Sequence, residues 1–163
     1  MRLVIDTNIW VKALTDLPHY KYDCESFLIH FVDGIHSLVV DYKWEILKEY
    51  DDNLKAFERY RIFYTMLEKT GRISFTDTTI PSKHIKKLNE LHFHEKEDQI
   101  FTGAAYNTDK CIVTEDSDYG KGTEEKSKID EKQAVLRYMQ EEMNLKIYDA
   151  SEAKRELVEG ERA

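Results

Sequence analysis

The stretch CIVTEDSDYG, residues 111–120, joins a short apolar run to three acids placed within four positions. Its first part, residues 111–114, is rich in β-branched side chains and is bounded by polar residues, which predicts a buried strand. Like charges repel at close range, so Glu115, Asp116 and Asp118 at the end of such a strand are costly without a compensating charge. The stretch therefore predicts a strand of an interior sheet with a cation site at its end.

This strand has four companions along the chain, and helical patterns separate them. The five strand candidates are residues 2–5 (RLVI), 37–41 (SLVVD), 72–75 (RISF), 111–114 (CIVT) and 145–149 (LKIYD). Strands that alternate with helices form right-handed crossovers and a parallel sheet with helices on both faces. The sequence therefore predicts an α/β fold, a three-layer α/β/α sandwich with a central, mostly parallel five-stranded sheet.

The size and composition of the chain indicate one domain. A chain of 163 residues with 41% hydrophobic content buries one sizeable core, and no Pro- or Gly-rich linker divides it. We expect a single domain over residues 1–160. We also expect a mobile loop at residues 120–131, because that stretch is charged and lacks apolar periodicity.

Charge and cysteine usage limit the partners and the compartment. With 24 Lys and Arg against 32 Asp and Glu, the net charge of −8 opposes a large non-specific surface for nucleic acid but allows a local basic groove. Cys24 and Cys111 lie far apart and form no CxxC motif, so we expect buried free thiols in a reducing compartment. Polar residues interrupt the apolar opening MRLVIDTNIWVKAL, which argues against a signal peptide or a membrane span. We therefore expect a cytoplasmic protein without membrane contact.

Acidic residues recur where the predicted strands end. Asp6 follows the first strand, and Asp116 and Asp118 follow the strand at residue 111. Asp98 falls in the first turn of the helix that precedes that strand. In open parallel sheets, ligands bind beyond the carboxyl ends of the strands, near the point where the strand order reverses, so we expect these carboxylates to converge there. Asp41, at the end of the second strand, is better explained as the N-cap of the next helix.

A divalent cation relieves the repulsion within such a group, which costs about 1 kcal/mol per close pair of carboxylates. Magnesium and manganese prefer oxygen ligands and commonly share one or two carboxylates with a phosphate of the substrate. A cation held in this way activates water for attack on phosphorus and stabilises the leaving oxygen. The acid pattern therefore favours an enzyme that hydrolyses phosphodiester bonds with Mg²⁺ or Mn²⁺ as cofactor.

Two segments carry a resemblance to a known family, VIDTNIW at residues 4–10 and EDQIFTGAAYNTDKCIVTEDSDY at residues 97–119. With the acidic helix between them, they resemble the PIN domain, a family of metal-dependent ribonucleases that includes the toxins of VapBC toxin–antitoxin modules. The resemblance covers residues 1–160 in order. It implies an endoribonuclease that acts on RNA or another single-stranded nucleic acid, with an antitoxin or a second copy of the chain as partner.

The resemblance also implies a role for each acid. Asp6, Asp98 and Asp116 match the metal-binding acids of the family. Asp118 matches a further ligand or a residue that supports one. The supporting polar residues that the resemblance implies are Asn8 and Thr114.

The remaining family acid is a glutamate in the helix after the second strand, where this chain has both Glu45 and Glu49. The two are four residues apart and therefore share one helix face. Glu45 is favoured because it lies nearer the carboxyl edge of the sheet. The letters KEY around Glu49 also resemble the family pattern, so both glutamates stay candidates.

Two other functions are alternatives to a nuclease. The main alternative is a PIN-like protein without catalysis that acts by binding a protein partner, although a silent fold has no reason to keep mutually repelling carboxylates. A phosphoryl-transfer or receiver-like module needs a second acid two residues after Asp6, where Asn8 stands.

Two expectations concern packing. Glu115 should face solvent, because its neighbours Thr114 and Asp116 point to the other side of the chain. Aromatic residues at helical spacing within residues 55–69 should belong to the core or to an interface rather than to a platform that stacks on bases. These residues are Phe57, Tyr60, Phe63 and Tyr64.

Overall fold

A five-stranded parallel sheet forms the middle of the molecule. The computed structural model describes residues 1–16 and 18–159. The strands are β1 (Arg2–Ile5), β2 (Ser37–Asp41), β3 (Ile73–Thr76), β4 (Cys111–Val113) and β5 (Lys146–Tyr148). Their order is β3-β2-β1-β4-β5, and every neighbouring pair is parallel. The predicted five-stranded sheet is confirmed, and within the described residues it is parallel throughout.

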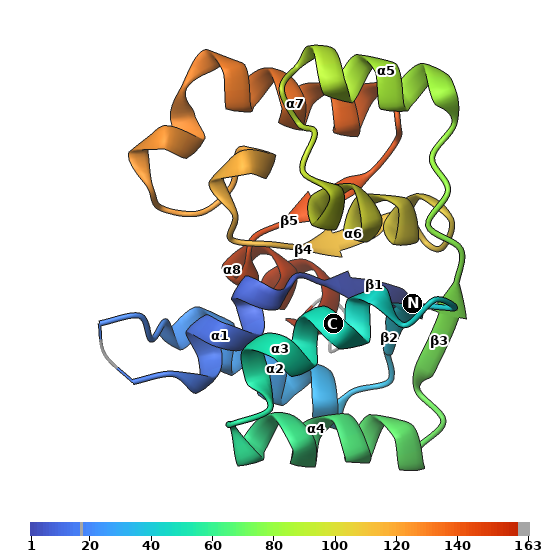
Figure 1. Ribbon diagram of the computed structural model, residues 1–163. Helices are drawn as coiled ribbons and strands as arrows, with labels where there is room; N and C mark the ends of the chain where they lie inside the picture. Colours follow the sequence, from blue (N-terminus) through green and yellow to red (C-terminus); the bar gives the residue numbers. More distant parts are fainter. Residues whose placement is uncertain (17, 160–163) are drawn as a thin grey trace.

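Helices cover both faces of this sheet. They are α1 (Thr7–Leu14), α2 (Tyr22–Asp33), α3 (Glu45–Leu54), α4 (Glu58–Lys69), α5 (Ser82–Glu90), α6 (Lys96–Tyr106), α7 (Asp130–Glu141) and α8 (Ala150–Ala153). The shorter elements are the 3-10 helices η1 (Ser117–Tyr119) and η2 (Glu125–Lys128) and the π-helical segment η3 (Lys154–Glu159). Figure 1 shows α5, α6 and α7 on one side of the sheet and α1 to α4 on the other. This arrangement confirms the three-layer α/β/α sandwich.

The central strands are buried because both faces of the sheet are covered. The apolar side chains of β2 and β4 are buried, as are Leu3, Val4 and Ile5 in β1. Such burial explains why these strands read as continuous apolar runs rather than as alternating ones. The hydroxyl of Tyr50 donates a hydrogen bond to the Ile5 carbonyl and so ties α3 to the end of β1.

The aromatic residues at the start of α4 and within it pack into the core, which was one of the two predicted locations, the other being an interface. Tyr60 is buried, and its ring lies 5.6 Å from that of Trp10 and 6.2 Å from that of Tyr50. The partly buried side chains that pack against the same core include Phe57, Phe63 and Tyr64. These rings hold α1, α3 and α4 together on one face of the sheet.

The Asp41 side chain binds the N-terminus of α3, but the N-cap position itself is Trp44, so the helix starts three residues later than an N-cap at Asp41 predicts. Its carboxylate accepts hydrogen bonds from the backbone N–H groups of Lys43 (3.0 Å), Glu45 (3.2 Å) and Ile46 (2.8 Å). The helix begins at Glu45 because the residue before it, Trp44, adopts a left-handed backbone with φ 64° and ψ 17°. The left-handed residue and the bonds to Asp41 together define the start of α3.

Small residues allow α6 to pack closely against the chain before α5. A Cβ atom on Gly103 would lie 1.9 Å from the carbonyl oxygen of Thr78, so glycine is required at this approach. Ala104 and Ala105 beside it are inaccessible to solvent. This packing fixes α6, and its first turn carries Asp98.

The segment 120–131 contains η2 and the first residues of α7, and its mobility stays a prediction. Within it Ser127 is buried, and its hydroxyl donates to the Glu124 carbonyl at 2.6 Å. Cys24 and Cys111 are buried and free, as expected. None of the helices in the described ranges is both long enough and apolar enough to span a membrane.

Candidate active site

The predicted acids lie at the carboxyl ends of β1 and β4, where the strand order reverses. From β1 the chain extends the sheet through β2 and β3, whereas β4 and β5 extend it on the opposite side. Ile5 pairs with Val113, and the Asp6 N–H donates to the Val113 carbonyl at 2.9 Å. Asp6 and Thr114 are therefore neighbours at the place where open α/β sheets bind ligands.

Hydrogen bonds join Asp6 to the segment after β4. Thr114 Oγ1 donates to Asp6 Oδ2 at 2.7 Å, and the Asp116 N–H donates to the same hydroxyl oxygen at 3.0 Å. Asn8 Nδ2 donates to Asp6 Oδ2 at 3.2 Å, while Asn8 Oδ1 accepts from the Glu115 N–H at 3.0 Å. The structure thus places both predicted supporting residues, Asn8 and Thr114, against Asp6.

Three carboxylates form a compact group at this end of the sheet. One oxygen from each of Asp98, Asp116 and Asp118 lies within 4.8 Å of the other two. Asp98 comes from the first turn of α6. Asp116 caps η1, where its Oδ1 accepts from the Asp118 N–H at 2.8 Å. Acids that the sequence places on two separate segments are therefore brought together.

Tyr119 and Thr102 hold this group in place, although sequence reasoning did not identify them as site residues. The hydroxyl of the fully buried Tyr119 donates to the Asp98 carbonyl at 2.9 Å. Thr102 Oγ1 donates to the same carbonyl at 2.8 Å and lies 3.1 Å from the Tyr119 hydroxyl. The sequence contains one sign of this role of Tyr119, which is the aromatic residue directly after the last acid in TEDSDY. A tyrosine buried there needs a polar partner for its hydroxyl, and the acid-bearing segments offer one.

Burial and mutual repulsion raise the pKa values of the site carboxylates. Burial, together with the charges of Asp116 and Glu49, raises the pKa of Asp6 to about 7. Burial and the charges of the neighbouring aspartates raise the pKa of Asp98 to about 8. Burial and the charge of Asp118 also raise the pKa of Asp116. Near neutral pH Asp98, and in part Asp6, therefore retain protons unless a cation offsets their charge.

Of the two glutamates on α3, Glu49 is the one that interacts with the acid group. Its charge contributes to the raised pKa of Asp6. Burial, and then the charge of Glu97, raises the pKa of Glu49 itself. Glu45 instead forms an ion pair with Lys96 at 3.5 Å. This effect of charge on Asp6 favours Glu49 over Glu45 as the candidate for the fourth acid, which the sequence ranking placed second.

The prediction that Glu115 faces solvent is wrong. Its side chain is buried, and its Oε2 lies 2.6 Å from the ammonium of Lys21. Its Oε1 accepts from the Ala150 N–H at 3.1 Å. The alternation of side chains was inferred correctly, since Thr114 bonds to Asp6 and Glu115 points elsewhere. The sheet is covered on both faces, however, so the side opposite Thr114 is also interior.

Lys132 on α7 brings a positive charge to the outer side of the acid group. Its Nζ lies 2.7 Å from Asp118 Oδ1, and this hydrogen bond raises the pKa of Lys132. Among the described residues no cationic side chain forms an ion pair with Asp6, Asp98 or Asp116. Among the described residues Asp6, Asp98 and Asp116 thus have no ion-pair partner, whereas Asp118 has one.

This donor set suits a hard divalent cation. Carboxylate oxygens are the ligands that Mg²⁺ and Mn²⁺ prefer. The oxygens of Asp98, Asp116 and Asp118 are already gathered, and the charge of Asp6 is close enough to raise the pKa of Asp98. A cation between these groups would offset the cost of burying their charges and the repulsion among them.

Comparison with protein families agrees with this geometry. The family model of the PIN domain matches residues 2–118, more than half of the 163-residue chain. The matched range runs from β1 to η1 and contains every predicted site residue. The comparisons with curated proteins and with solved structures give no match. PIN domains are generally nucleases and typically use divalent metal ions. This chain therefore belongs to the PIN domain family.

Proposed function

We propose that this PIN domain is a metal-dependent endoribonuclease that hydrolyses phosphodiester bonds of RNA. The proposal rests on the convergence of Asp98, Asp116 and Asp118 beside Asp6, where the strand order reverses. Burial and repulsion raise the pKa values of three of these acids, which is costly for a purely structural site. Perturbed carboxylates of this kind cluster where a cation or a proton is handled.

In this proposal Asp6, Asp98 and Asp116 hold one Mg²⁺ or Mn²⁺ ion, and Asp118 lies beside them. When bound, the ion neutralises the carboxylates, polarises the phosphate and lowers the pKa of the attacking water. The Thr114 hydroxyl keeps Asp6 and the Asp116 segment in register through its two hydrogen bonds. We assign a single ion because a lysine ammonium already neutralises Asp118.

Glu49 is the proposed acceptor of the proton that the attacking water loses. Its side chain is half-buried, and its pKa is raised by burial, so it holds a proton more readily than an exposed glutamate does. General bases work best when their pKa approaches the working pH. Glu45 is less suited, because its carboxylate is already paired with Lys96.

A cavity of about 410 Å³ beside Asn8 offers a path for the substrate. Its lining includes Lys12, His19, Tyr20 and Lys21. Lys21 is engaged in an ion pair, whereas Lys12 makes none within the described part of the chain. We therefore propose that the Lys12 ammonium binds a phosphate of the RNA, since basic side chains supply most of the affinity for nucleic acids.

The finer assignments rest on the family resemblance and on composition. They are the role of toxin in a toxin–antitoxin module, an antitoxin partner, a homodimer and a cytoplasmic location. A catalytically silent PIN-like protein that acts by binding a protein partner is the alternative function, and cleavage assays separate it from a nuclease.

The test is cleavage of labelled single-stranded RNA and DNA of one sequence in Mg²⁺, Mn²⁺ or EDTA. We expect the wild-type protein to cleave RNA with either cation and to show no cleavage in EDTA. We expect the variant Asp98→Asn to show no cleavage under any of these conditions. Calorimetry should give one Mn²⁺ ion per chain. Metal binding without cleavage of either nucleic acid would favour the silent alternative.

A second arm tests the substrate path. Lys12→Gln should raise the KM for RNA by about fivefold or more and leave the affinity for Mn²⁺ unchanged, because it removes one phosphate contact. Lys86→Gln, an exposed lysine on α5, is the matched control and should behave as wild type. Equal KM values for Lys12→Gln and wild type would move the RNA path away from this cavity.

A further inference from the structure

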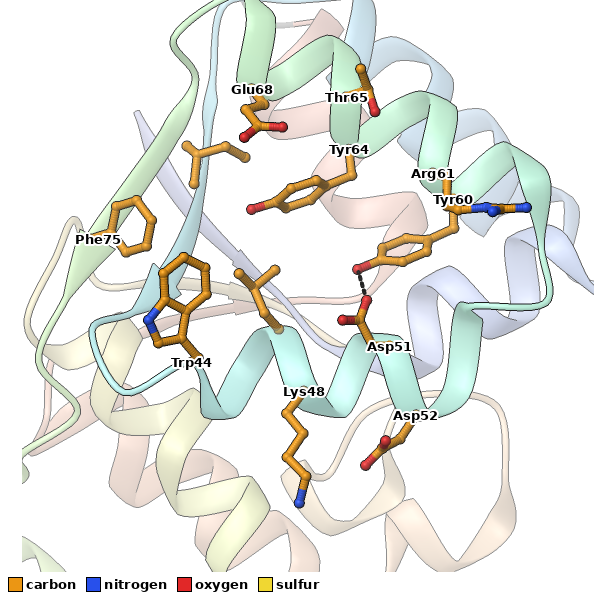
Figure 2. A pocket seen from close by; sticks show the side chains of 12 residues that line it. Trp44, Lys48, Asp51, Asp52, Tyr60, Arg61, Tyr64, Thr65, Glu68 and Phe75 are labelled. Carbon is orange, nitrogen blue, oxygen red and sulfur yellow. Dashed lines mark hydrogen bonds between the residues drawn. The ribbon is translucent and has the colours of Figure 1, made fainter.

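A second cavity, of about 690 Å³, lies between α3, α4 and the edge strand β3 (Figure 2). None of the acids of the candidate active site lines it. Its apolar and aromatic lining consists of Trp44, Leu47, Tyr60, Tyr64, Ile73 and Phe75. The cavity is therefore a separate feature of the molecule, and it is large enough for a substantial side chain.

Charged side chains around this cavity are arranged by sign. Figure 2 shows the carboxylates of Asp51 and Glu68 turned toward the aromatic rings, whereas the charged ends of Lys48 and Arg61, which also line the cavity, extend outward. Asp51 accepts a hydrogen bond from the Tyr60 hydroxyl at 3.2 Å. Neither carboxylate forms an ion pair with any side chain in the described ranges. The cavity thus combines aromatic rings with two carboxylates that have no ion-pair partner, and it has basic side chains at its rim.

The charges of Asp51 and Glu68 both act on the hydroxyl of Tyr64. Burial raises the pKa of Tyr64, and the charges of Glu68 and Asp51 raise it further. A cation bound among these groups would contact both aromatic ring faces and carboxylates. Ring faces and carboxylates each attract positive charge.

Exposed aromatic side chains continue from the cavity onto the surface. The rings of Tyr42 and Trp44 both contact the ring of Phe75, and their centroids lie 6.1 Å and 5.6 Å from its centroid. Trp44 is 58% exposed and keeps a left-handed backbone, which costs a non-glycine residue about 1 kcal/mol or more. An exposed apolar patch that includes a strained residue is typical of a binding surface.

The strand beside this patch has a free edge. β3 is the outermost strand and pairs with β2 alone, so its other edge has no strand partner among the described residues. Ile73 and Phe75 of β3 line the cavity. An extended peptide that pairs with such an edge projects alternate side chains to one face, and so can place one of them in a pocket there.

We propose that the β3 edge and this cavity bind an extended basic segment of a protein partner, with one arginine side chain between the rings and the carboxylates of Asp51 and Glu68. A guanidinium group stacks on aromatic faces and forms paired hydrogen bonds with carboxylates, which matches both kinds of lining. Charge complementarity selects this occupant over a nucleic acid strand, whose phosphates would lie against two carboxylates. The site does not depend on the nuclease activity.

The test uses the full chain and the probe peptide acetyl-Thr-Val-Arg-Val-Thr-amide. Tryptophan fluorescence measures binding. Trp44 is exposed beside the cavity, whereas Trp10, the other tryptophan, is fully buried, so a change in emission on binding is assigned to Trp44. NMR resonances of the β3 amides locate the peptide. We expect the arginine peptide to shift both signals, and the same peptide with citrulline, the neutral isostere of arginine, to bind at least about tenfold more weakly.

Two double variants that remove equal charge from the same two helices provide a matched comparison. Asp51→Asn with Glu68→Gln removes the carboxylates inside the cavity, and we expect a loss of affinity of about tenfold or more. Asp52→Asn with Glu58→Gln is the control: Asp52 belongs to the lining, but Figure 2 shows its carboxylate turned away from the aromatic rings, and Glu58 does not line the cavity. The control should retain affinity within about twofold. The citrulline comparison on the wild-type chain keeps the test decisive if a variant does not fold.

Several results would overturn this inference. They include equal affinity for the arginine and citrulline peptides, no binding of either, and equal losses in both double variants. Shifts confined to the acid group around Asp116 would place the peptide at the candidate active site instead. Single-stranded RNA that shifts the β3 resonances would contradict a peptide site. N-acetylarginine amide binding as tightly as the peptide would indicate a pocket for small cations.

Discussion

Replacing Asp6 by asparagine should stabilise the metal-free protein, and the gain should grow with pH. Asp6 is 7% exposed, and its pKa is raised from 3.8 to about 7, mainly by burial. Between these two pH values the folded state holds a proton that the unfolded state has released, so this group lowers stability as pH rises. Asparagine keeps an oxygen that accepts from the Thr114 hydroxyl but carries no charge.

The size of the effect follows from the same pKa values. Raising a carboxyl pKa from 3.8 to about 7 costs about 4 kcal/mol once the group is ionised in both states, at about 1.4 kcal/mol per tenfold change. About 1.5 kcal/mol of this cost is already present at pH 5. Proton sharing with Asp98 reduces the remainder, so we expect the advantage of Asp6→Asn to grow by about 2 kcal/mol from pH 5 to pH 8.

Urea unfolding in EDTA at pH 5 and pH 8, followed by circular dichroism, measures this difference. Asp52→Asn, which changes an exposed acid on α3, is the control and should show no such trend. Adding Mg²⁺ at pH 8 should reverse the order, because the ion stabilises only the wild-type site. A variant less stable than wild type at pH 8 in EDTA, or an advantage that is the same at both pH values, would refute the reasoning.

Three further changes probe other parts of the structure. Thr114→Val removes a hydroxyl that orients two site acids, so Mn²⁺ affinity by calorimetry and the RNA cleavage rate should both fall by about 10- to 100-fold; unchanged affinity would contradict that role. Glu49→Gln should slow RNA cleavage by about 100-fold or more, whereas Glu45→Gln should stay within about twofold of wild type, and the reverse pattern would reassign the fourth acid. Gly103→Ala places a methyl group 1.9 Å from the Thr78 carbonyl and should lower the free energy of unfolding in urea by about 2 kcal/mol or more; an unchanged value would contradict the close packing.

The sheet and the gathering of acids could be predicted because both follow from topology. Each of the runs RLVI, SLVVD and CIVT contains three consecutive apolar residues, which is typical of strands covered on both faces. Parallel strands present their carboxyl ends at one edge, so Asp6 and Asp116 had to approach each other whatever their detailed packing. Asp98 followed because it opens the helix that leads into β4.

Contacts between distant segments could not be predicted in this way. Alternation along a strand shows which side Glu115 faces, but not that Lys21, 94 residues earlier, covers that side. The ion pair between Lys132 and Asp118 likewise depends on how α7 packs against η1. The ranking of Glu45 above Glu49 was based on distance along the helix, whereas their contacts depend on how α3 is rotated about its axis.

RNA cleavage in Mg²⁺ by wild type and by Asp116→Asn decides whether the acid group is the active site. Asparagine at this position keeps an oxygen that accepts from the Asp118 N–H, so the fold, checked by circular dichroism, should be preserved. We predict that wild type cleaves RNA only with the divalent cation and that the variant loses this activity by a factor of about 100 or more. Cleavage by Asp116→Asn at the wild-type rate in Mg²⁺ would contradict the assignment of this site.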